Sequence, residues 1–193
     1  MEFVADNTAT DWLLRSRTPD MRLITFGPAG FEAYARLRFI RDPLRPGEQE
    51  ADVHLPEDHP SEIDQSRRAL HLLAAFTSTP LDCYFCLWEG YSDTPLPAEA
   101  RDGPLVELPH RRFALFRGPL RDIDTWEADF GGGHPVAPPA FVWPADRSWC
   151  FTADVDPHWA GIGAGRDAVD ALVAAPGLDV VPADPSEPQP AYR

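Results

Sequence analysis

The chain has 193 residues, with 17 arginines, no lysine, 31 acidic residues and a formal net charge of -14. This length suits one domain, and the absence of lysine excludes the usual phosphate-binding loop, a Schiff-base enzyme and a protein kinase, which each need that amine. The acidic balance argues against a nucleic-acid partner, because binding a phosphate backbone requires a surplus of basic side chains.

The first residues lack the basic start and apolar stretch of a secretory signal. The apolar runs are far shorter than the about 20 residues of a membrane-spanning helix. Three cysteines are an odd and small number for a secreted disulfide framework. We therefore expect a cytoplasmic protein with reduced thiols, no membrane partner and no cofactor.

Proline, at 22 residues, divides the chain into short elements. The first third predicts a short helix over 11–16, a strand over 22–26 and a strand over 31–40 whose apolar residues share one parity. These two strands could form a hairpin. The segment 42–64 carries eight acidic residues and one arginine, which indicates either a solvated loop or a surface that faces a partner.

The strongest predicted helix covers 62–76 and begins after the capping residue Ser61. Glycines at 161–165 indicate a turn before a helix, with anion capture as the alternative. The remaining predicted elements are strands over 83–89, 112–117, 141–143, 148–156 and 178–181, and helices over 122–130 and 166–175.

About seven strands and three or four helices in mixed order predict an α+β fold. The sheet should be mainly antiparallel with the helices packed on one face, because a parallel sheet would need a helix between most strands. Residues 1–182 should form this single domain. Residues 183–193 contain several prolines and are predicted to be a disordered tail.

A candidate metal or acid/base set consists of Asp154, Asp156 and His158, which alternate along and just beyond the predicted strand 148–156. Side chains two apart in a strand share a face, and this set could hold Zn²⁺, Mn²⁺ or Mg²⁺. The alternative is a solvated strand face, since same-face positions lie about 7 Å apart along a strand and Pro157 would interrupt it.

Cys83 and Cys86 have the spacing of half a zinc site or of a redox dithiol. Residues three apart in a strand point to opposite faces, so the sequence favours two buried structural cysteines. Cys150 has no partner nearby in sequence.

A second candidate site is the hairpin around Trp143 and Trp159. Asp146 and Arg147 occupy its predicted turn, where a rigid base could present them to a partner. Tryptophans suit a core as well as an aromatic pocket or interface, and both interpretations remain open.

A third candidate is the net-basic segment that contains Arg111 and Arg112. It could form an anion-binding edge, or its arginines could pair with the excess of acidic residues in the protein.

Four strings carry a resemblance to known sequences: 30–36, 83–91, 108–120 and 143–150, the last followed by 154–156. Over most of residues 20–182 they resemble an uncharacterised family of proteins from bacteria with high-GC genomes. No activity is assigned to that family, so the resemblance implies no site residue.

The sequence favours a non-enzymatic, acidic cytoplasmic protein that binds a basic protein partner, with an immunity-type inhibitor of a toxin as one form. The alternative is a metal-dependent hydrolase or small-ligand enzyme that uses Asp154, Asp156 and His158. No familiar enzyme motif occurs, which leans against an enzyme without excluding one.

Overall fold

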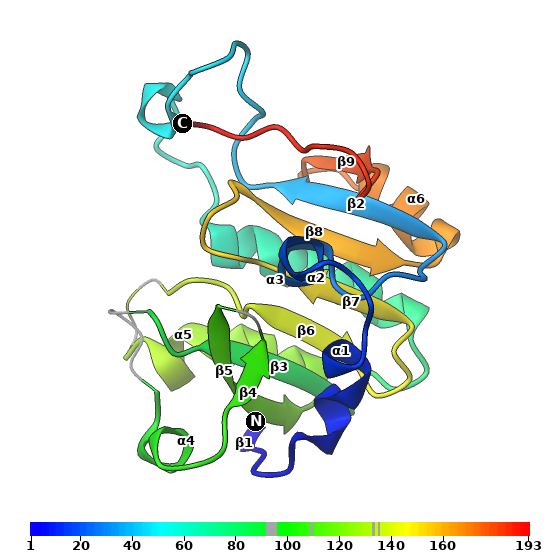
Figure 1. The fold of residues 1–193 in the computed structure, drawn as a ribbon. Coiled ribbons are helices and arrows are strands. Elements are labelled where there is room, and N and C mark those ends of the chain that lie inside the picture. Colours follow the sequence, from blue (N-terminus) through cyan, green and yellow to red (C-terminus); the bar gives the residue numbers. More distant parts are fainter. Residues whose placement is uncertain (92–95, 109, 133, 135) are drawn as a thin grey trace.

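The computed structural model describes the chain except residues 92–95, 109, 133 and 135, and it shows a mixed α+β fold around one antiparallel sheet (Figure 1). The sheet has nine strands in the order β1-β5-β3-β6-β7-β8-β2-β9, and β4 pairs with β5. In chain order they are β1 (Glu2–Phe3), β2 (Ala33–Arg38), β3 (Cys83–Trp88), β4 (Val106–Leu108), β5 (Arg111–Gly118), β6 (Phe141–Pro144), β7 (Trp149–Thr152), β8 (Trp159–Ala164) and β9 (Val180–Ala183).

Six α-helices accompany the sheet in the described part of the chain: α1 (Asp11–Leu14), α2 (Asp20–Phe26), α3 (Glu62–Leu73), α4 (Ala98–Arg101), α5 (Trp126–Phe130) and α6 (Arg166–Val173). The α+β class and the antiparallel sheet are confirmed, whereas the predicted counts of about seven strands and three or four helices are too low.

Helices cover both faces of the sheet, which corrects the expectation of one covered face (Figure 1). Alternate residues of β5 enter different cores: Ala114 and Phe116 pack with α3, α5 and α6, while Phe113 and Leu115 pack with α1 and α2. Because side chains alternate across a strand, a strand that is apolar on both parities must be covered on both sides. The central strands therefore contribute to two cores.

The segment predicted as a strand over 22–26 is the helix α2 instead. Pro19 precedes it, Asp20 lies in its first turn, and its apolar residues Leu23, Ile24 and Phe26 are buried. Proline before a helix and an acidic first turn both favour helix initiation. The predicted hairpin between this segment and the next strand is therefore wrong, and β2 pairs with β8 and β9.

Of the glycines predicted to form a turn, Gly161 and Gly163 lie in β8, which is buried along its whole length, and Gly165 is the residue before α6. A Cβ built on Gly161 would lie 1.8 Å from the carbonyl oxygen of Thr25 in α2. Glycine is required at this position because the backbone of α2 approaches the strand too closely for any side chain. Gly161 therefore serves the packing of α2 on β8, and a Cβ on Gly163 would collide with the rings of Phe31 and Tyr34.

The sulfur-bearing side chains of β3 lie as predicted, with Cys83 in one core and Cys86 in the other. All three cysteines are buried and free, and burial raises the pKa of Cys83 to about 12. In the described residues, no helix has the length and apolar character needed to cross a membrane.

Residues after β9 form neither helix nor strand, but they lie against the domain. Arg22 of α2 donates a hydrogen bond to the Ser186 carbonyl, and the amide of Arg193 donates to the Glu48 carbonyl. The sequence predicts a disordered tail over residues 183–193; in the structure Ala183 ends β9, and the residues after it make these contacts with α2 and with Glu48.

Candidate functional site

The carboxylates of the candidate metal set lie in a turn between β7 and β8, not on one strand face, because β7 ends at Thr152. Asp154 accepts two hydrogen bonds from Arg111, from Nε at 3.0 Å and from Nη2 at 3.3 Å. The same Nη2 donates to Asp156 at 3.2 Å. One guanidinium therefore occupies oxygens that a metal ion would need.

His158, the third member of the set, has a different partner. Its Nε2 lies 3.1 Å from Oδ1 of Asp42, and its side chain is 2% exposed. Within the described residues, no three His, Cys, Asp or Glu side chains are grouped so that they could hold a metal ion. The alternation in the sequence does not bring Asp154, Asp156 and His158 onto a common ion.

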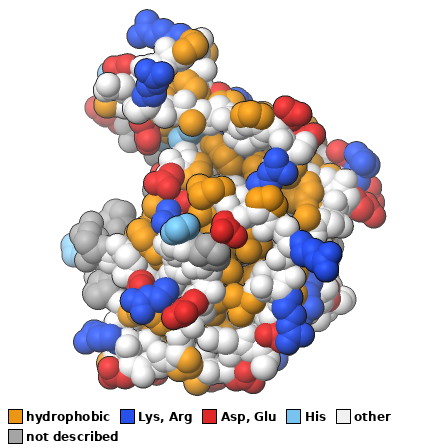
Figure 2. All heavy atoms as spheres, in the orientation of Figure 1, with side chains coloured by type: hydrophobic (Ala, Val, Ile, Leu, Met, Phe, Trp, Pro, Cys, Tyr) orange, Lys and Arg blue, Asp and Glu red, His pale blue; other side chains and the backbone are white. Residues whose placement is uncertain are grey.

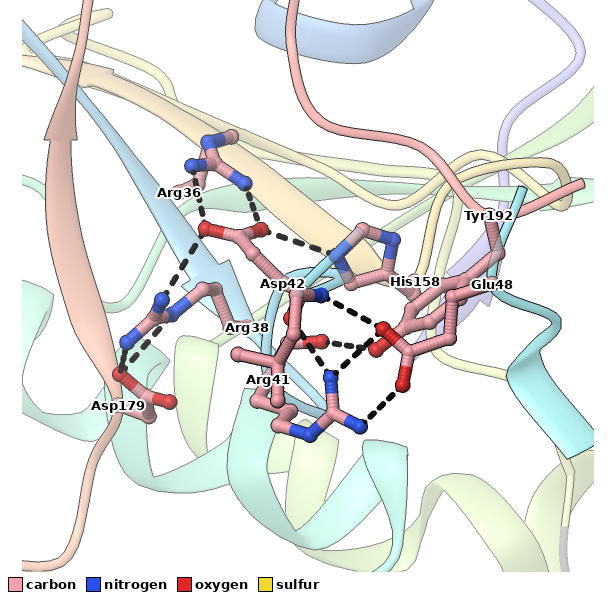
Figure 3. A network of polar contacts seen from close by, with 9 residues as sticks. Arg36, Arg38, Arg41, Asp42, Glu48, His158, Asp179 and Tyr192 are labelled. Carbon is pink, nitrogen blue, oxygen red and sulfur yellow. Dashed lines mark hydrogen bonds and ion pairs between the residues drawn. The ribbon is translucent and has the colours of Figure 1, made fainter. Parts of the chain in front are cut away.

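A polar network links His158 to the end of β2 (Figure 3). Asp42 accepts two hydrogen bonds from the buried Arg36, at 2.6 and 3.0 Å, and one from Arg38 at 3.0 Å. Burial alone would raise the pKa of Asp42, but hydrogen bonds from Arg36 and His158 hold it well below its ordinary value. Burial lowers the pKa of His158, and its hydrogen bond with Asp42 partly opposes that shift.

This network could not be predicted from the sequence, because Arg36 and Arg38 lie on the polar parity of the predicted strand 31–40 and nothing nearby identifies their partners. Their partner Asp42 lies in the loop after β2, and Asp179 lies directly before β9. The one available signal was the pair of arginines at alternate positions of an otherwise apolar strand. Such a pair requires carboxylates nearby, since buried charges are paired.

The predicted binding hairpin separates into buried tryptophans and an exposed turn. Trp143 is 1% exposed and stacks on Tyr84, while Trp159 is 4% exposed. Asp146 accepts hydrogen bonds from the amide and hydroxyl of Ser78 at 2.7 and 2.8 Å. Asp146 and Arg147 are both exposed, but the carboxylate of Asp146 is used within the fold, where it anchors a neighbouring loop.

The predicted anion-binding edge is neutralised by the protein's own acids. Arg111 pairs with Asp154 and Asp156 and lies over the ring of Trp88, 5.0 Å from its centroid. Arg112 pairs with Glu89 at 2.5 Å. Of the two open alternatives, the structure favours internal ion pairs.

A hollow of about 150 Å³ brings the acidic segment and the β7–β8 turn together. Its lining includes four carboxylates, Glu50, Glu62, Asp154 and Asp156, together with Tyr91. Glu50 belongs to what we call the arm, residues 42–58, which Figure 1 shows projecting from the sheet. Two features that lie about a hundred positions apart in the sequence thus face one space.

The electrostatics of this hollow show an excess of negative charge. Partial desolvation, followed by the charge of Glu50, raises the pKa of Glu62. Burial, then the charges of Asp154 and Glu62, raise the pKa of Tyr91. Neither Glu50 nor Glu62 forms an ion pair with any residue that the structure describes. Like charges held close together favour binding of a cation.

Elsewhere the surface is mixed. Figure 2 shows basic and acidic side chains interspersed over one face, with apolar side chains between them. The net charge of -14 is therefore not by itself a guide to where a partner binds. The hollow is more informative, because there the carboxylates outnumber the single guanidinium that reaches them.

No protein-family model, curated protein or solved structure matches the chain. The resemblance to a family from high-GC bacteria stays a prediction.

Proposed function

We propose that this chain is a non-enzymatic cytoplasmic protein that binds a basic protein, and that immunity-type inhibition of a toxin is the form such binding takes. The observation that carries the proposal is the hollow lined by Glu50, Glu62, Asp154 and Asp156. The cytoplasmic part rests on three buried, unpaired cysteines, which suit a reducing compartment.

The size and charge of the hollow fit one side chain of a partner. Its volume of about 150 Å³ is below the range of about 300 to 1,000 Å³ of pockets for small molecules. An arginine head group is planar and donates several hydrogen bonds. Charge-assisted hydrogen bonds to Glu50 and Glu62 would stabilise it, and their mutual repulsion would be relieved at the same time.

The enzyme alternative has weaker support, because Arg111 already binds both Asp154 and Asp156. A thermal-shift assay with Zn²⁺, Mn²⁺, Ca²⁺ and Mg²⁺ tests it, since a ligand that binds the native state raises the melting temperature. We expect no shift with any of the four. A rise with one of them would favour the metal-dependent enzyme over the binding protein.

The binding proposal is tested with a pair of charge variants. Glu50→Gln with Glu62→Gln removes two charges from the hollow, and Asp167→Asn with Asp170→Asn removes two exposed charges from α6. Each variant is immobilised beside the wild type, and the captured proteins are identified at several salt concentrations.

We expect a basic protein to bind the wild type and the α6 variant, and to be lost from the hollow variant. Its capture should weaken as salt rises, because exposed charges are screened. Equal capture on all three chains would show that the hollow carries no binding.

A further inference from the structure

Residues 184–193 cross the end of the sheet and reach the arm (Figure 1). Three hydrogen bonds with backbone carbonyls hold them: Arg22 donates to Ser186 at 2.9 Å, the Tyr192 hydroxyl donates to Arg41 at 2.5 Å, and the amide of Arg193 donates to Glu48 at 3.1 Å. We call this segment the strap. Because the net contribution of each such hydrogen bond is modest, the strap is weakly held.

The surface beneath the strap is aromatic. The ring of Trp159 lies 5.0 Å from that of Phe26, and the ring of Tyr192 meets His158 edge-on at 4.7 Å. Trp159 and His158 are almost completely buried with the strap in place, although the strap itself is mostly exposed. The strap thus covers an aromatic surface while remaining accessible to solvent.

We call the surface beneath the strap, which includes Trp159 and His158, the groove. It has unfilled space next to Trp159. Cavities of about 320 and 360 Å³ are each lined by Trp159 and by strap residues, and Gln189 borders both. Both hollows open to solvent, so the strap is not packed on Trp159 as a core segment would be. This loose contact is consistent with a segment that can leave.

The chemistry of the strap matches a known way of binding peptides. It contains prolines at 185, 188 and 190 and has no helix or strand. Extended proline-rich segments bind aromatic grooves with little loss of conformational entropy. At its far end, Tyr192 and Arg193 line a cavity together with Glu50 and Asp156, two of the carboxylates that also line the acidic hollow.

We propose that this groove is a peptide-binding site for an extended, proline-containing segment that ends in an aromatic residue followed by arginine. The strap occupies the site as an internal ligand, and a segment of the basic partner displaces it. The identity of the partner as a basic protein rests on the proposed function, whereas the groove and its peptide chemistry rest on the contacts of Trp159, His158 and the strap.

Displacement has a measurable consequence for affinity. A tethered segment experiences an effective concentration in the millimolar range. Because an added peptide can bind only molecules whose groove is free of the strap, its apparent affinity falls in proportion to the fraction of such molecules. If the strap is docked about ten times as often as it is free, weakening it should tighten the binding of an added peptide about tenfold.

The experiment uses the full chain and a synthetic peptide with the sequence of residues 183–193. Ala191→Cys, which is exposed, gives a single reactive thiol because the native cysteines are buried. A bimane fluorophore on that thiol is quenched by the indole of Trp159 when the strap is docked. We expect quenched fluorescence in the absence of peptide and recovery as the peptide is added.

A variant pair measures the competition. Tyr192→Ala removes a ring contact and one hydrogen bond of the strap, and it should bind the peptide about tenfold more tightly than the wild type. Leu81→Ala, a truncation of an apolar side chain that is 71% exposed elsewhere, should bind like the wild type. A peptide with alanine in place of both the tyrosine and the arginine should bind neither.

If Tyr192→Ala fails to fold, recovery of bimane fluorescence in the otherwise unchanged chain decides the question. No recovery at millimolar peptide, or equal recovery with the doubly substituted peptide, would overturn the proposal. A dimer that forms with rising protein concentration and exchanges straps would also overturn it, since the occupant would then be a second copy. A failure here leaves the binding proposal standing, because the Glu50 and Glu62 variants test that separately.

Discussion

Replacement of Asp146 by alanine should destabilise the fold, although the residue occupies an exposed turn. Its carboxylate accepts hydrogen bonds from the amides of Ser78 at 2.7 Å and Ser148 at 3.1 Å, and from the hydroxyls of Ser78 and Thr77. The hydroxyls can turn to water, whereas two backbone amides lose a fixed acceptor. At about 1 kcal/mol for each amide, the free energy of unfolding should fall by about 2 kcal/mol.

For a chain of this length that loss corresponds to a melting temperature lower by about 4 to 8 °C, measured by calorimetry. Arg147→Ala is the matched control at the next position. Its guanidinium lies over the ring of Trp12 at 5.5 Å, an exposed contact worth about 0.5 to 1 kcal/mol, so the melting temperature of this variant should fall by only about 1 to 4 °C. If Asp146→Ala melts within about 1 °C of the wild type, Asp146 is free to bind a partner and our structural interpretation is wrong.

The pH dependence of this difference has a definite sign. Burial alone would raise the pKa of Asp146, but hydrogen bonds from Ser148 and Ser78 lower it below its ordinary value. A group with a depressed folded-state pKa contributes its stability fully above its unfolded-state pKa, about 3.9. That contribution is lost as pH falls through the folded-state value. The gap between wild type and Asp146→Ala should therefore be constant from pH 7 to pH 5 and shrink below about pH 4.

Three further substitutions or reactions have clear expected outcomes. Gly161→Ala should prevent folding or strongly lower the urea midpoint of unfolding, because the new Cβ would lie 1.8 Å from the Thr25 carbonyl oxygen. The control Gly165→Ala should fold, because its Cβ would meet nothing closer than 4.0 Å. Equal midpoints for the two variants would refute the close approach. Arg111→Met should lower the free energy of unfolding by about 3 kcal/mol, because it leaves the nearly buried Asp154 unpaired, and adding Asp154→Asn should restore part of the loss in a denaturation series. The thiols of the native protein should resist alkylation and react only after unfolding, because burial raises the pKa of all three cysteines, Cys83, Cys86 and Cys150. Rapid labelling of the native protein would contradict their burial.

The sequence predicts those parts of the fold whose signals are local. The helix α3 begins where its cap was expected, with the amide of Asp64 donating to the hydroxyl of Ser61 at 3.2 Å. The apolar residues on both parities of β3 indicated a covered strand, and Cys83 and Cys86 do lie in opposite cores. Periodicity and capping are properties of neighbouring residues, so they need no knowledge of the rest of the chain.

Predictions failed where a distant segment decides the local structure. Seven residues of α2 contain alternating and helical apolar patterns at once, and their docking on β8 selects the helix. The glycines of β8 look like turn residues until the helix above them is known. Context overrides intrinsic preference in both segments.

The sequence indicated Asp154, Asp156 and the acidic segment 42–64 separately, but it could not predict their arrangement, because each contact of the candidate site joins remote positions. Arg111 meets Asp154 across 43 positions, and His158 meets Asp42 across 116. No spacing rule covers such pairs. What the sequence did supply was composition: an excess of acids and an arginine-only set of bases, which together require many internal ion pairs.

One feature of the sequence argues against placing Asp154, Asp156 and His158 on one face of a strand. In the hairpin of β6 and β7, Phe141 pairs with Thr152, and the amide of Ala153 donates to the carbonyl of Ala140. The residues before Ala140 are prolines at 138 and 139, which have no amide hydrogen to continue the ladder. The strand opposite must therefore end near Ala153, so the carboxylates that follow enter a turn. There, an arginine from β5 and the acidic arm determine their surroundings, and the hollow with its excess of negative charge is the result.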